Sequence, residues 1–455
     1  MLELRSLPAT APLRLTTGWT VSADPGDRGR ADRWFDAERP DARAIPVPGV
    51  IQQVLPDQHG VFWYYLRFRL ATEAFAGQVV QLRFGAVDYL AEVWLNGQRI
   101  GGHEGAETPF VLDATAALAR SGDQLLAMRV VNPDLQVIDG LKLAEIACRN
   151  KSISTGYAPG AGYNYGGILL PVDLAVVPRL RVADLWVRAD AESGRILATI
   201  TVANDTDAAV SAALRLHAAP SAEGSTLAEA DAVIAAAPGT SEHEIELTIP
   251  NVRRWNLEDP HLYRITATLD SSEHRHDASV RTGFRDFRIV DGFFHLNGTR
   301  IFLRSSHTGN HFPIGMIVPM DPDLMRRDLL MAKASGFNTV RFIAGMPYPE
   351  QLDYCDEIGL MVYEENLSAW LLGDSPQLGS RFDLALREMI LRDRNHPCVT
   401  IWGLLNETPP NTTFLHAVAS LPLLRSLDTL EVPARRARDR AARGGLRARV
   451  RVHVG

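Results

Sequence analysis

The sequence predicts a multidomain protein of the β plus α/β class, with two antiparallel β-sandwiches followed by βα units around a parallel sheet. Three observations predict it. A chain of 455 residues is too long for one hydrophobic core and should divide into about three domains. Short strands separated by turn residues fill the chain up to about residue 285. Apolar strands alternate with helical stretches from about residue 290.

The first sandwich is predicted by short strands that start at about residue 61. They read VFWYYLRFRL, VVQLRFGAV, AEVWLNGQRI and QLLAMRVVN, and Gly, Pro, Asn and Asp separate them. Within AEVWLNGQRI, Asn96 and Gly97 can take the positive φ angles of a type I′ turn, which predicts a tight hairpin. Hairpins are typical of an antiparallel sandwich, and we place this domain at residues 1–180.

A second series of strands predicts an immunoglobulin-like sandwich at residues 181–285. LWVRA, ILATITVAN, SAALRLHAA, HEIELTIP and HLYRITATL follow one another at sandwich-like intervals. The Ala-rich segment 221–241 could be mistaken for a helix. Its small and turn-forming residues and its flanking strands favour a loop or an edge instead.

The third domain, at residues 286–420, has the pattern of βα units around a parallel sheet. The expected strands are IFLRSSH, TVRFI, LMVYEE and VTIWGLL. Asp321 and Pro322 are a typical N-cap and first residue of a helix, and Pro349 opens a second helix that Gly359 closes. DLALREMILRDR is a third helix. The sequence therefore predicts four βα strands.

The remaining segment, residues 421–455, changes character. From Pro433 to Gly455 it has eight Arg, one Asp, no Lys and no aromatic residue. A basic arm for nucleic acid is one interpretation. Translation out of frame in a GC-rich gene is favoured, because no aromatic stacking platform accompanies the charge and only three of the 47 basic residues in the chain are Lys. We expect an aberrant or disordered tail and no nucleic-acid partner.

Composition limits the compartment and the partners. The formal net charge of −7 gives no general attraction for nucleic acid or anionic membranes. The three cysteines, Cys148, Cys355 and Cys398, lack CxxC spacing and indicate neither a disulfide framework nor a zinc cluster. No stretch approaches the roughly 20 apolar residues that span a bilayer, and the N-terminus lacks a signal-peptide core. We expect a soluble cytoplasmic protein with reduced thiols and no membrane partner.

The strongest chemical signal is the run RDRNHP followed by VTIWGLLNE, which places Asn406 and Glu407 at the C-terminal end of an apolar strand. In a (β/α)₈ barrel, active sites lie at that end. A carboxyl group there, bordered by Trp402 and low-dielectric strand ends, can have a pKa high enough to protonate a glycosidic oxygen near neutral pH. An isolated Asn-Glu pair would be read as a surface carboxylate that starts a loop, so the surrounding sequence decides.

That surrounding sequence resembles glycoside hydrolase family 2 over roughly residues 61–415. DYLAEVWLNGQRIGGHEGAETPFVLD resembles the sugar-binding sandwich of β-galactosidases and β-glucuronidases. WNLEDPHLYRITATL and GFRDFRIVDGFFHLNGTRIFLR resemble the immunoglobulin-like domain and the entry to the barrel. GFNTVRF, YCDEIGLMVYEE and RNHPCVTIWGLLNE resemble the barrel core. The resemblance implies a jelly-roll sandwich, an immunoglobulin-like sandwich and the N-terminal half of a (β/α)₈ TIM barrel.

The function that the resemblance implies is retaining hydrolysis of terminal β-linked sugars, β-galactosidase-like by default, on a carbohydrate substrate and without a cofactor. Glu407 would act first as general acid and then as base. Asn406 would contact the sugar 2-hydroxyl, through a hydrogen bond that strengthens in the transition state.

Three more residues could bind substrate. Arg341 would neutralise carboxylates in the pocket, or could equally belong to a structural ion pair. Glu365 could bind substrate hydroxyls or a cation, although a structural hydrogen bond at the barrel rim is slightly favoured. His307 and His311 could face the pocket, but a lone His is more often packed or solvated. The residues after Glu365 supply no His that would support a magnesium site, so we expect no metal.

The resemblance departs from the family at its end. Retaining hydrolysis needs a second carboxylate roughly 5 to 5.5 Å from the first, which the family carries on its seventh strand. Only 48 residues follow Glu407, with Asp428, Glu431 and Asp439 as their acidic members. We therefore expect a chain truncated within the barrel. Unpaired strand edges could join copies into a homo-oligomer. A non-catalytic carbohydrate-binding protein or an inactive fragment is the alternative.

Overall fold

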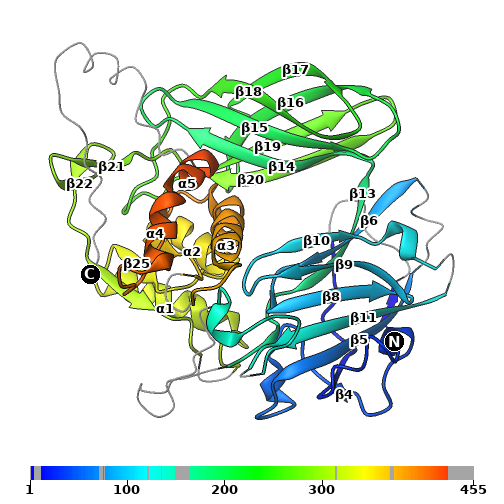
Figure 1. The fold of residues 1–455 in the computed structure, drawn as a ribbon. Coiled ribbons are helices and arrows are strands. Elements are labelled where there is room, and N and C mark those ends of the chain that lie inside the picture. Colours follow the sequence, from blue (N-terminus) through cyan, green and yellow to red (C-terminus); the bar gives the residue numbers. More distant parts are fainter. Residues whose placement is uncertain are drawn as a thin grey trace.

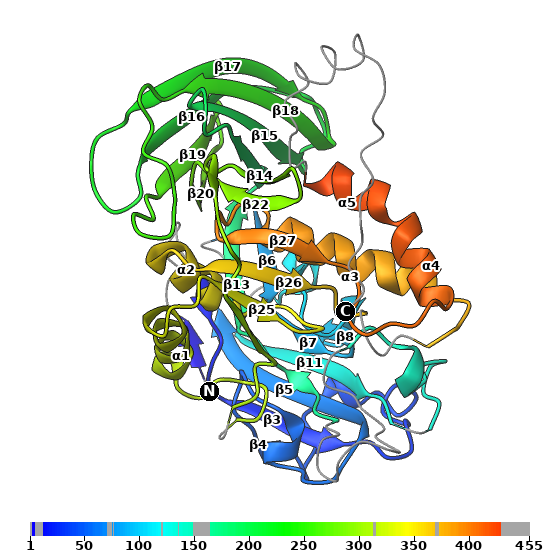
Figure 2. The ribbon, with the colours of Figure 1, turned by 90° about the vertical axis from the view of Figure 1, so that its left-hand side faces the viewer.

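The computed structural model describes residues 2–4, 12–70, 75, 77–119, 122–134, 136–148, 164–312, 315–368 and 373–428. These residues form two β-sandwiches and a parallel sheet covered by helices (Figure 1). In both Figure 1 and Figure 2 the second sandwich, in green, lies above the yellow-to-orange parallel sheet, and the first sandwich, in blue and cyan, lies beneath or beside it. The fold class expected from the sequence is confirmed.

The first sandwich packs two sheets face to face, with antiparallel strand orders β4-β3-β5-β11-β8-β9 and β10-β6-β13-β2; β1 adds to β5 in parallel. Its elements are β1 (Leu2–Leu4), β2 (Leu13–Arg14), β3 (Trp19–Ala23), η1 (Trp34–Asp36), β4 (Arg43–Ala44), η2 (Ile51–Gln53), β5 (Gly60–Leu70), β6 (Gln78–Phe84), β7 (Val87–Asp88), β8 (Leu90–Leu95), β9 (Gln98–Glu104), β10 (Phe110–Asp113), η4 (Thr115–Ala117), β11 (Asp123–Asn132), η5 (Leu143–Glu145), β12 (Gly167–Ile168) and β13 (Val172–Pro178). Alternate residues of β5, including Phe62, Tyr64 and Leu66, enter the core between the sheets.

The hairpin expected at Asn96 and Gly97 is present. Both residues have positive φ, +52° and +79°, and they join β8 to β9 in an antiparallel pair. The side chain of Asn96 also fastens the turn, because its Nδ2 donates to the carbonyl of Ala117 at 2.9 Å.

The second sandwich combines a sheet of order β14-β15-β18 with a sheet of order β17-β16-β19-β20. Its strands are β14 (Leu180–Ala189), β15 (Arg195–Asn204), β16 (Val210–Pro220), β17 (Ala228–Ala236), β18 (Gly239–Thr248), β19 (Tyr263–Asp270) and β20 (Arg275–Thr282). The Ala-rich segment 221–241 is not helical: it begins as a loop and continues as β17 at the edge of its sheet, as expected. Strand β20 was not expected, because RHDASVRT alternates without a large apolar residue on its core face.

A small meander leads into the parallel sheet, whose strand order is β24-β25-β26-β27. The elements of this part are β21 (Phe287–Val290), β22 (Phe293–Leu296), β23 (Thr299–Arg300), β24 (Ser305–Thr308), α1 (Pro322–Ala334), β25 (Thr339–Phe342), α2 (Pro349–Ile358), β26 (Met361–Glu365), α3 (Leu378–Asp393), β27 (Val399–Gly403), α4 (Thr412–Ala419) and α5 (Leu421–Leu427). The four strands are parallel throughout, as βα units require.

The local helix signals are also present. The carboxylate of Asp321 accepts from the backbone N–H of Asp323 at 3.0 Å and caps α1. Gly359 ends α2 in the left-handed conformation, at φ +69°.

Some boundaries differ from the expectation. The first strand of the sheet begins at Ser305 and not at Ile301, because the backbone N–H of Ile301 donates to the carbonyl of Phe294 in the meander. Helix α3 starts at Leu378 and so includes Gly379 and Ser380, which are weak helix formers; the burial of Leu378 and Phe382 holds this extra turn.

The end of the described chain is partly helical. Residues 421–427, which we had assigned to the tail, form α5 and contact α3. The Arg-rich run 433–455 lies outside the described residues. No helix in the described part of the chain has both the length and the apolar composition that crossing a membrane requires.

Candidate active site

The expected site residues lie at the carboxyl edge of the parallel sheet, where β25, β26 and β27 run side by side (Figure 2). Arg341 is on β25, Glu365 is the last residue of β26, and Asn406 follows the end of β27. In a parallel sheet the carboxyl ends of all strands meet at one edge, so residues far apart in sequence come together there.

Arg341 is the centre of this arrangement. Its Nε lies 2.6 Å from Oε1 of Glu365, and its Nη2 donates to Oδ1 of Asn406 at 2.6 Å. The other oxygen of Glu365, Oε2, accepts from the backbone N–H of Ala344 at 2.6 Å. Glu365 is fully buried, and a buried carboxylate needs such partners to stay ionised.

The bond to Arg341 fixes the orientation of the Asn406 amide. Its oxygen faces the guanidinium, so its NH₂ group must point the other way. The side chain of Asn406 is only 5% exposed, and its Nδ2 has no acceptor among the described residues. An unpartnered donor in a buried amide is unusual, and a ligand hydroxyl oxygen is the kind of group that satisfies it.

Glu407 follows directly and has an unusual backbone. Its φ is +47°, in the left-handed region that residues other than glycine seldom adopt, and its side chain is exposed. Such strain concentrates at functional sites, where the surrounding structure over-determines one conformation. The following residue supports this bend, because Oγ1 of Thr408 donates to the carbonyl of Asn406 at 3.0 Å.

Trp402 does not border Glu407, contrary to the expectation. In the register of the sheet it lies beside Glu364, which places it on the helix-covered face and away from Glu365. Its indole N–H donates to Oδ2 of Asp428 at 2.8 Å. The low-dielectric neighbour that we expected to raise the pKa of Glu407 is therefore turned toward the helices.

The histidines stand at the margin of the site. His307 lies beside Arg341 in the strand register, so both start from the same face of the sheet, and the imidazole of His307 is exposed. His311 is also exposed, in the loop after β24. The structure thus brings Arg341, Glu365 and Asn406 into direct contact and leaves the histidines around them.

Tyr363 belongs to this face and was missed from the sequence. It is the register neighbour of Arg341 on β26, and the Arg341 guanidinium carbon lies 5.1 Å from the centre of its ring. Burial, and then the negative charge of Glu365, raises the pKa of Tyr363 to about 12, so the phenol stays protonated. Its signal was the alternation in LMVYEE, which puts Tyr363 and Glu365 on one face.

The absence of a side chain at Gly403 allows Tyr363 and Glu365 to lie close to the end of β27. A Cβ at this position would lie 2.4 Å from Cε2 of Tyr363 and 2.5 Å from Cγ of Glu365. Any side chain at the end of β27 would therefore displace both residues from the sheet face that carries Arg341.

One group of possible metal ligands occurs in the described residues, and it lies at the opposite edge of the sheet. Side-chain atoms of Asp356, His396 and Cys398 lie within 4.8 Å of one another, before β27 begins. They are already engaged, because Nδ1 of His396 is 2.6 Å from Oδ2 of Asp356, whose other oxygen accepts from the backbone N–H of Cys398. This arrangement is that of a structural clamp.

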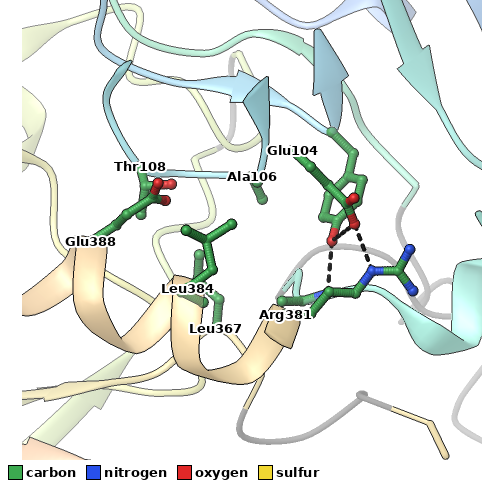
Figure 3. Close-up of a pocket in the computed structure, with 11 residues that line it drawn as sticks. Glu104, Ala106, Thr108, Leu367, Arg381, Leu384 and Glu388 are labelled. Carbon is green, nitrogen blue, oxygen red and sulfur yellow. Dashed lines mark hydrogen bonds and ion pairs between the residues drawn. The ribbon is translucent and has the colours of Figure 1, made fainter. Parts of the chain in front are cut away.

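Cavities occur elsewhere. One enclosed cavity of about 10 Å³ lies between α3 and the chain after β9, where Glu104 and Thr108 face Arg381 and Glu388 (Figure 3). A more open groove of about 390 Å³ lies over β8 and β9, with Arg30, Glu92 and Asp139 in its lining. Neither contains the residues gathered around Arg341.

Comparison with known proteins agrees with this architecture. Three sequence profiles of one family match in succession: the sugar-binding domain of glycosyl hydrolases family 2 at residues 50–176, the central domain of the family at 180–285 and its TIM barrel domain at 287–430.

Curated relatives carry glycosidase names. A putative β-glucuronidase of Formosa agariphila is 28% identical over 338 residues, which are 72% of this chain and 38% of that protein. A β-galactosidase of Pectobacterium atrosepticum is 24% identical over 88% of this chain and 40% of its own length. One from Thermoanaerobacter pseudethanolicus is 27% identical over 77% of this chain and 45% of its own. The chain thus spans well under half of the curated relatives it matches.

Solved structures share the fold. The β-glucuronidase of Ruminococcus gnavus superposes with a TM-score of 0.78 at 22% identity, over 92% of this chain and 71% of that one. A family 2 member from Bacteroides cellulosilyticus superposes with a TM-score of 0.75 at 19% identity, over 92% of this chain and 56% of that one. With all three domains matched in order, the chain belongs to glycosyl hydrolases family 2.

Proposed function

We propose that this protein is a retaining β-glycosidase that acts on terminal β-linked sugars, with Glu407 as general acid and base. The observation that carries the proposal is the free NH₂ group of Asn406 immediately beside Glu407. A sugar whose glycosidic oxygen reaches Glu407 would present its ring hydroxyls to this donor.

Each residue of the site would have its own role in the reaction. Glu407 would protonate the leaving-group oxygen and then deprotonate water as the glycosyl-enzyme is hydrolysed. Asn406 would donate to the sugar 2-hydroxyl, with Arg341 holding its amide. Both oxygens of Glu365 are occupied by Arg341 and Ala344, so Glu365 would act on substrate binding through Arg341, which it keeps in place. His307 would contact the sugar from the exposed side. No cofactor or metal enters these steps.

A second carboxylate must act as nucleophile in a double displacement. We assign this role to none of the described residues, because Glu365 is neutralised by Arg341 and Asp428 binds the indole of Trp402. Turnover therefore requires that this carboxylate reach the site from elsewhere, for example from a second copy of the chain. The proposal therefore concerns the acid/base half of the site, and the alternative function is a carbohydrate-binding protein without turnover.

The preferred substrate is a β-galactoside. Relatives of this chain are named β-galactosidase and β-glucuronidase, so both sugars are candidates. The guanidinium of Arg341 is already paired with Glu365, which leaves it poorly placed to bind the carboxylate of a uronic acid. We infer a cytoplasmic location, because the buried residues Cys148, Cys355 and Cys398 form no disulfide within the described part of the chain, as suits a reducing compartment.

The test is hydrolysis of aryl β-galactosides, β-glucuronides, β-glucosides and β-mannosides by the 455-residue chain. We expect turnover that is greatest on the galactoside and falls by at least about 100-fold in Glu407→Gln. Glu273→Gln, the same change at an exposed position of the second sandwich, should leave it unchanged. If no substrate is turned over, but galactose still shifts the thermal unfolding temperature, the non-catalytic binding function replaces the proposal.

A further inference from the structure

A group of buried charges joins the first sandwich to the barrel sheet, on the face of the sheet opposite the candidate site. Glu364 on β26 points into it, Arg392 and Asp393 come from the end of α3, and Glu107 comes from the chain between β9 and β10. Figure 3 shows how α3 faces this part of the first sandwich, with Arg381 and Glu388 opposite Glu104 and Thr108.

Burial at this junction is nearly complete. The exposed fraction is 0% for Glu364, 1% for Asp393 and 7% for Glu107. The side chain of Arg392 is 10% exposed. The carboxyl groups of Glu364 and Asp393 therefore lie beside one guanidinium away from water, an arrangement that disfavours two negative charges.

Arg392 is committed to other partners. Its Nε and Nη2 donate to the two oxygens of Asp393 at 2.7 and 2.6 Å. Its remaining bonds go to the carbonyls of Glu107 and Pro347, at 3.3 and 2.7 Å. The guanidinium comes no closer than 3.9 Å to Glu364, beyond hydrogen-bond range.

Glu364 consequently has no donor. Neither of its oxygens accepts a hydrogen bond from the described residues. An ionised carboxylate in this position would bear the full cost of desolvation, whereas a protonated one becomes a donor that can bond to the neighbouring carboxylate of Asp393.

We propose that Glu364 and Asp393 share one proton, and that this proton binds the first sandwich to the barrel sheet through Arg392. A metal ion is a poor alternative occupant, because the guanidinium of Arg392 already holds both oxygens of Asp393. With the proton in place, Asp393 carries the one negative charge that Arg392 neutralises directly. Without it, Glu364 repels Asp393 and Glu107 across the junction.

The surrounding carboxylates favour the protonated form of Glu364, whereas the guanidinium of Arg392 disfavours it. Burial, then the charge of Asp393, raises the pKa of Glu364 well above its ordinary value of 4.5, while Arg392 opposes this and Glu107 adds to it. The charge of Asp393 also acts on His396, a further titratable group near the pair.

The raised pKa of Glu364 determines how the free energy of unfolding depends on pH. The folded protein holds a proton on Glu364 that the unfolded chain releases above about pH 4.5, so this group favours folding at low pH. Its contribution falls as pH rises from the unfolded pKa toward the raised folded pKa. Over that window it changes the unfolding equilibrium constant by up to tenfold per pH unit.

The experiment compares the free energy of unfolding of the wild type and Glu364→Gln across this pH range. Gln mimics the protonated acid, since its amide can donate to Asp393, so the variant should fold and should lack the stability loss that the wild type shows as pH rises. Glu223→Gln, at an exposed position before β17, is the matched control and should follow the wild type. Parallel wild-type and Glu364→Gln profiles, with the variant less stable at every pH, would overturn the proposal.

A second measurement does not depend on the variant folding. Infrared spectra of the wild type at neutral pH should contain the C=O stretch of a protonated carboxylic acid. Exchange from H₂O into D₂O should shift this band, so the difference between the two spectra reveals it. Absence of that band at neutral pH would equally overturn the shared proton. Neither measurement involves a sugar, so the inference stands apart from the proposed glycosidase activity.

Discussion

Arg341 and Asn406, which are 65 positions apart in the chain, are joined by a hydrogen bond of 2.6 Å between Nη2 and Oδ1. This single bond decides which end of the Asn406 amide faces the open edge of the sheet. The donor is turned away from Arg341, which links the geometry of β25 to the sugar contact that we propose at the end of β27.

The first prediction concerns the partner of that donor. If the amide of Asn406 donates to the sugar 2-hydroxyl, the wild type should hydrolyse an aryl β-galactoside far better than its 2-deoxy analogue. Asn406→Ser should lower kcat/KM on the galactoside by about 100-fold and on the analogue much less. Steady-state kinetics on the two substrates measures this, and an equal loss on both would refute the contact.

The second prediction concerns the ion pair between Arg341 and Glu365. Arg341→Met leaves Glu365 fully buried without its cation and should lower the free energy of unfolding by about 3 kcal/mol. Urea unfolding at neutral pH measures the change. The double variant Arg341→Met with Glu365→Gln removes both charges and should recover more than half of the loss; a double variant no more stable than the single one would contradict the account.

The third prediction tests the close approach at Gly403. Gly403→Ala places a Cβ within 2.4 Å of Tyr363 and 2.5 Å of Glu365 and should destabilise the protein by about 2 kcal/mol. Gly26→Ala is the matched control, because its Cβ would meet its nearest neighbour at 3.5 Å. Equal thermal unfolding temperatures for the two variants would show that the sheet face accommodates a methyl group.

The fourth prediction is a pH dependence at the opposite edge of the sheet. Burial acts to lower the pKa of His396, but the charge and hydrogen bond of Asp356 outweigh it, and the pKa is raised above 6.5. A raised folded pKa means that this stabilisation is complete below about pH 6.5 and is lost as pH rises through the folded value.

Unfolding experiments at a series of pH values test this with two variants. The difference in stability between wild type and His396→Gln should be largest in acid and should shrink toward alkaline pH. His217→Gln, on β16 and partly exposed, should show no such trend. A constant difference for His396→Gln would mean that folding leaves the pKa of this imidazole unchanged, which would contradict the raised pKa.

Local signals explain what the sequence could predict of the fold. Asn96-Gly97, Asp321-Pro322 and Gly359 each act through their own backbone, so the turn and the helix ends were predictable. Strand β20 and helices α4 and α5 were not, because they have only 8, 8 and 7 residues, too few for a periodic pattern to be distinguished from a loop. The domain boundaries at 180, 285 and 420 stay predictions.

The site was predictable in part. The run that ends in Asn406 and Glu407, and the strand ends at Arg341 and Glu365, pointed to one edge of the sheet. Which side chains bond there depends on the register of β25, β26 and β27, which the sequence does not display. The alternation in LMVYEE already placed Tyr363 on the face of Glu365, but its contact with Arg341 depends on that register. The face of Trp402 was missed because one residue of register changes the face on which a side chain lies.

If Glu407 is the general acid, the activity lost in Glu407→Gln should depend on the acidity of the leaving group, and this dependence is the most direct test of its role. We would measure kcat/KM of wild type and Glu407→Gln on two aryl β-galactosides, one with a strongly acidic phenol and one with a weakly acidic phenol. We expect the variant to lose at least about 100-fold more activity on the galactoside of the weakly acidic phenol, because that phenol needs a proton to depart. An equal loss on both substrates, or no wild-type turnover of either, would contradict it.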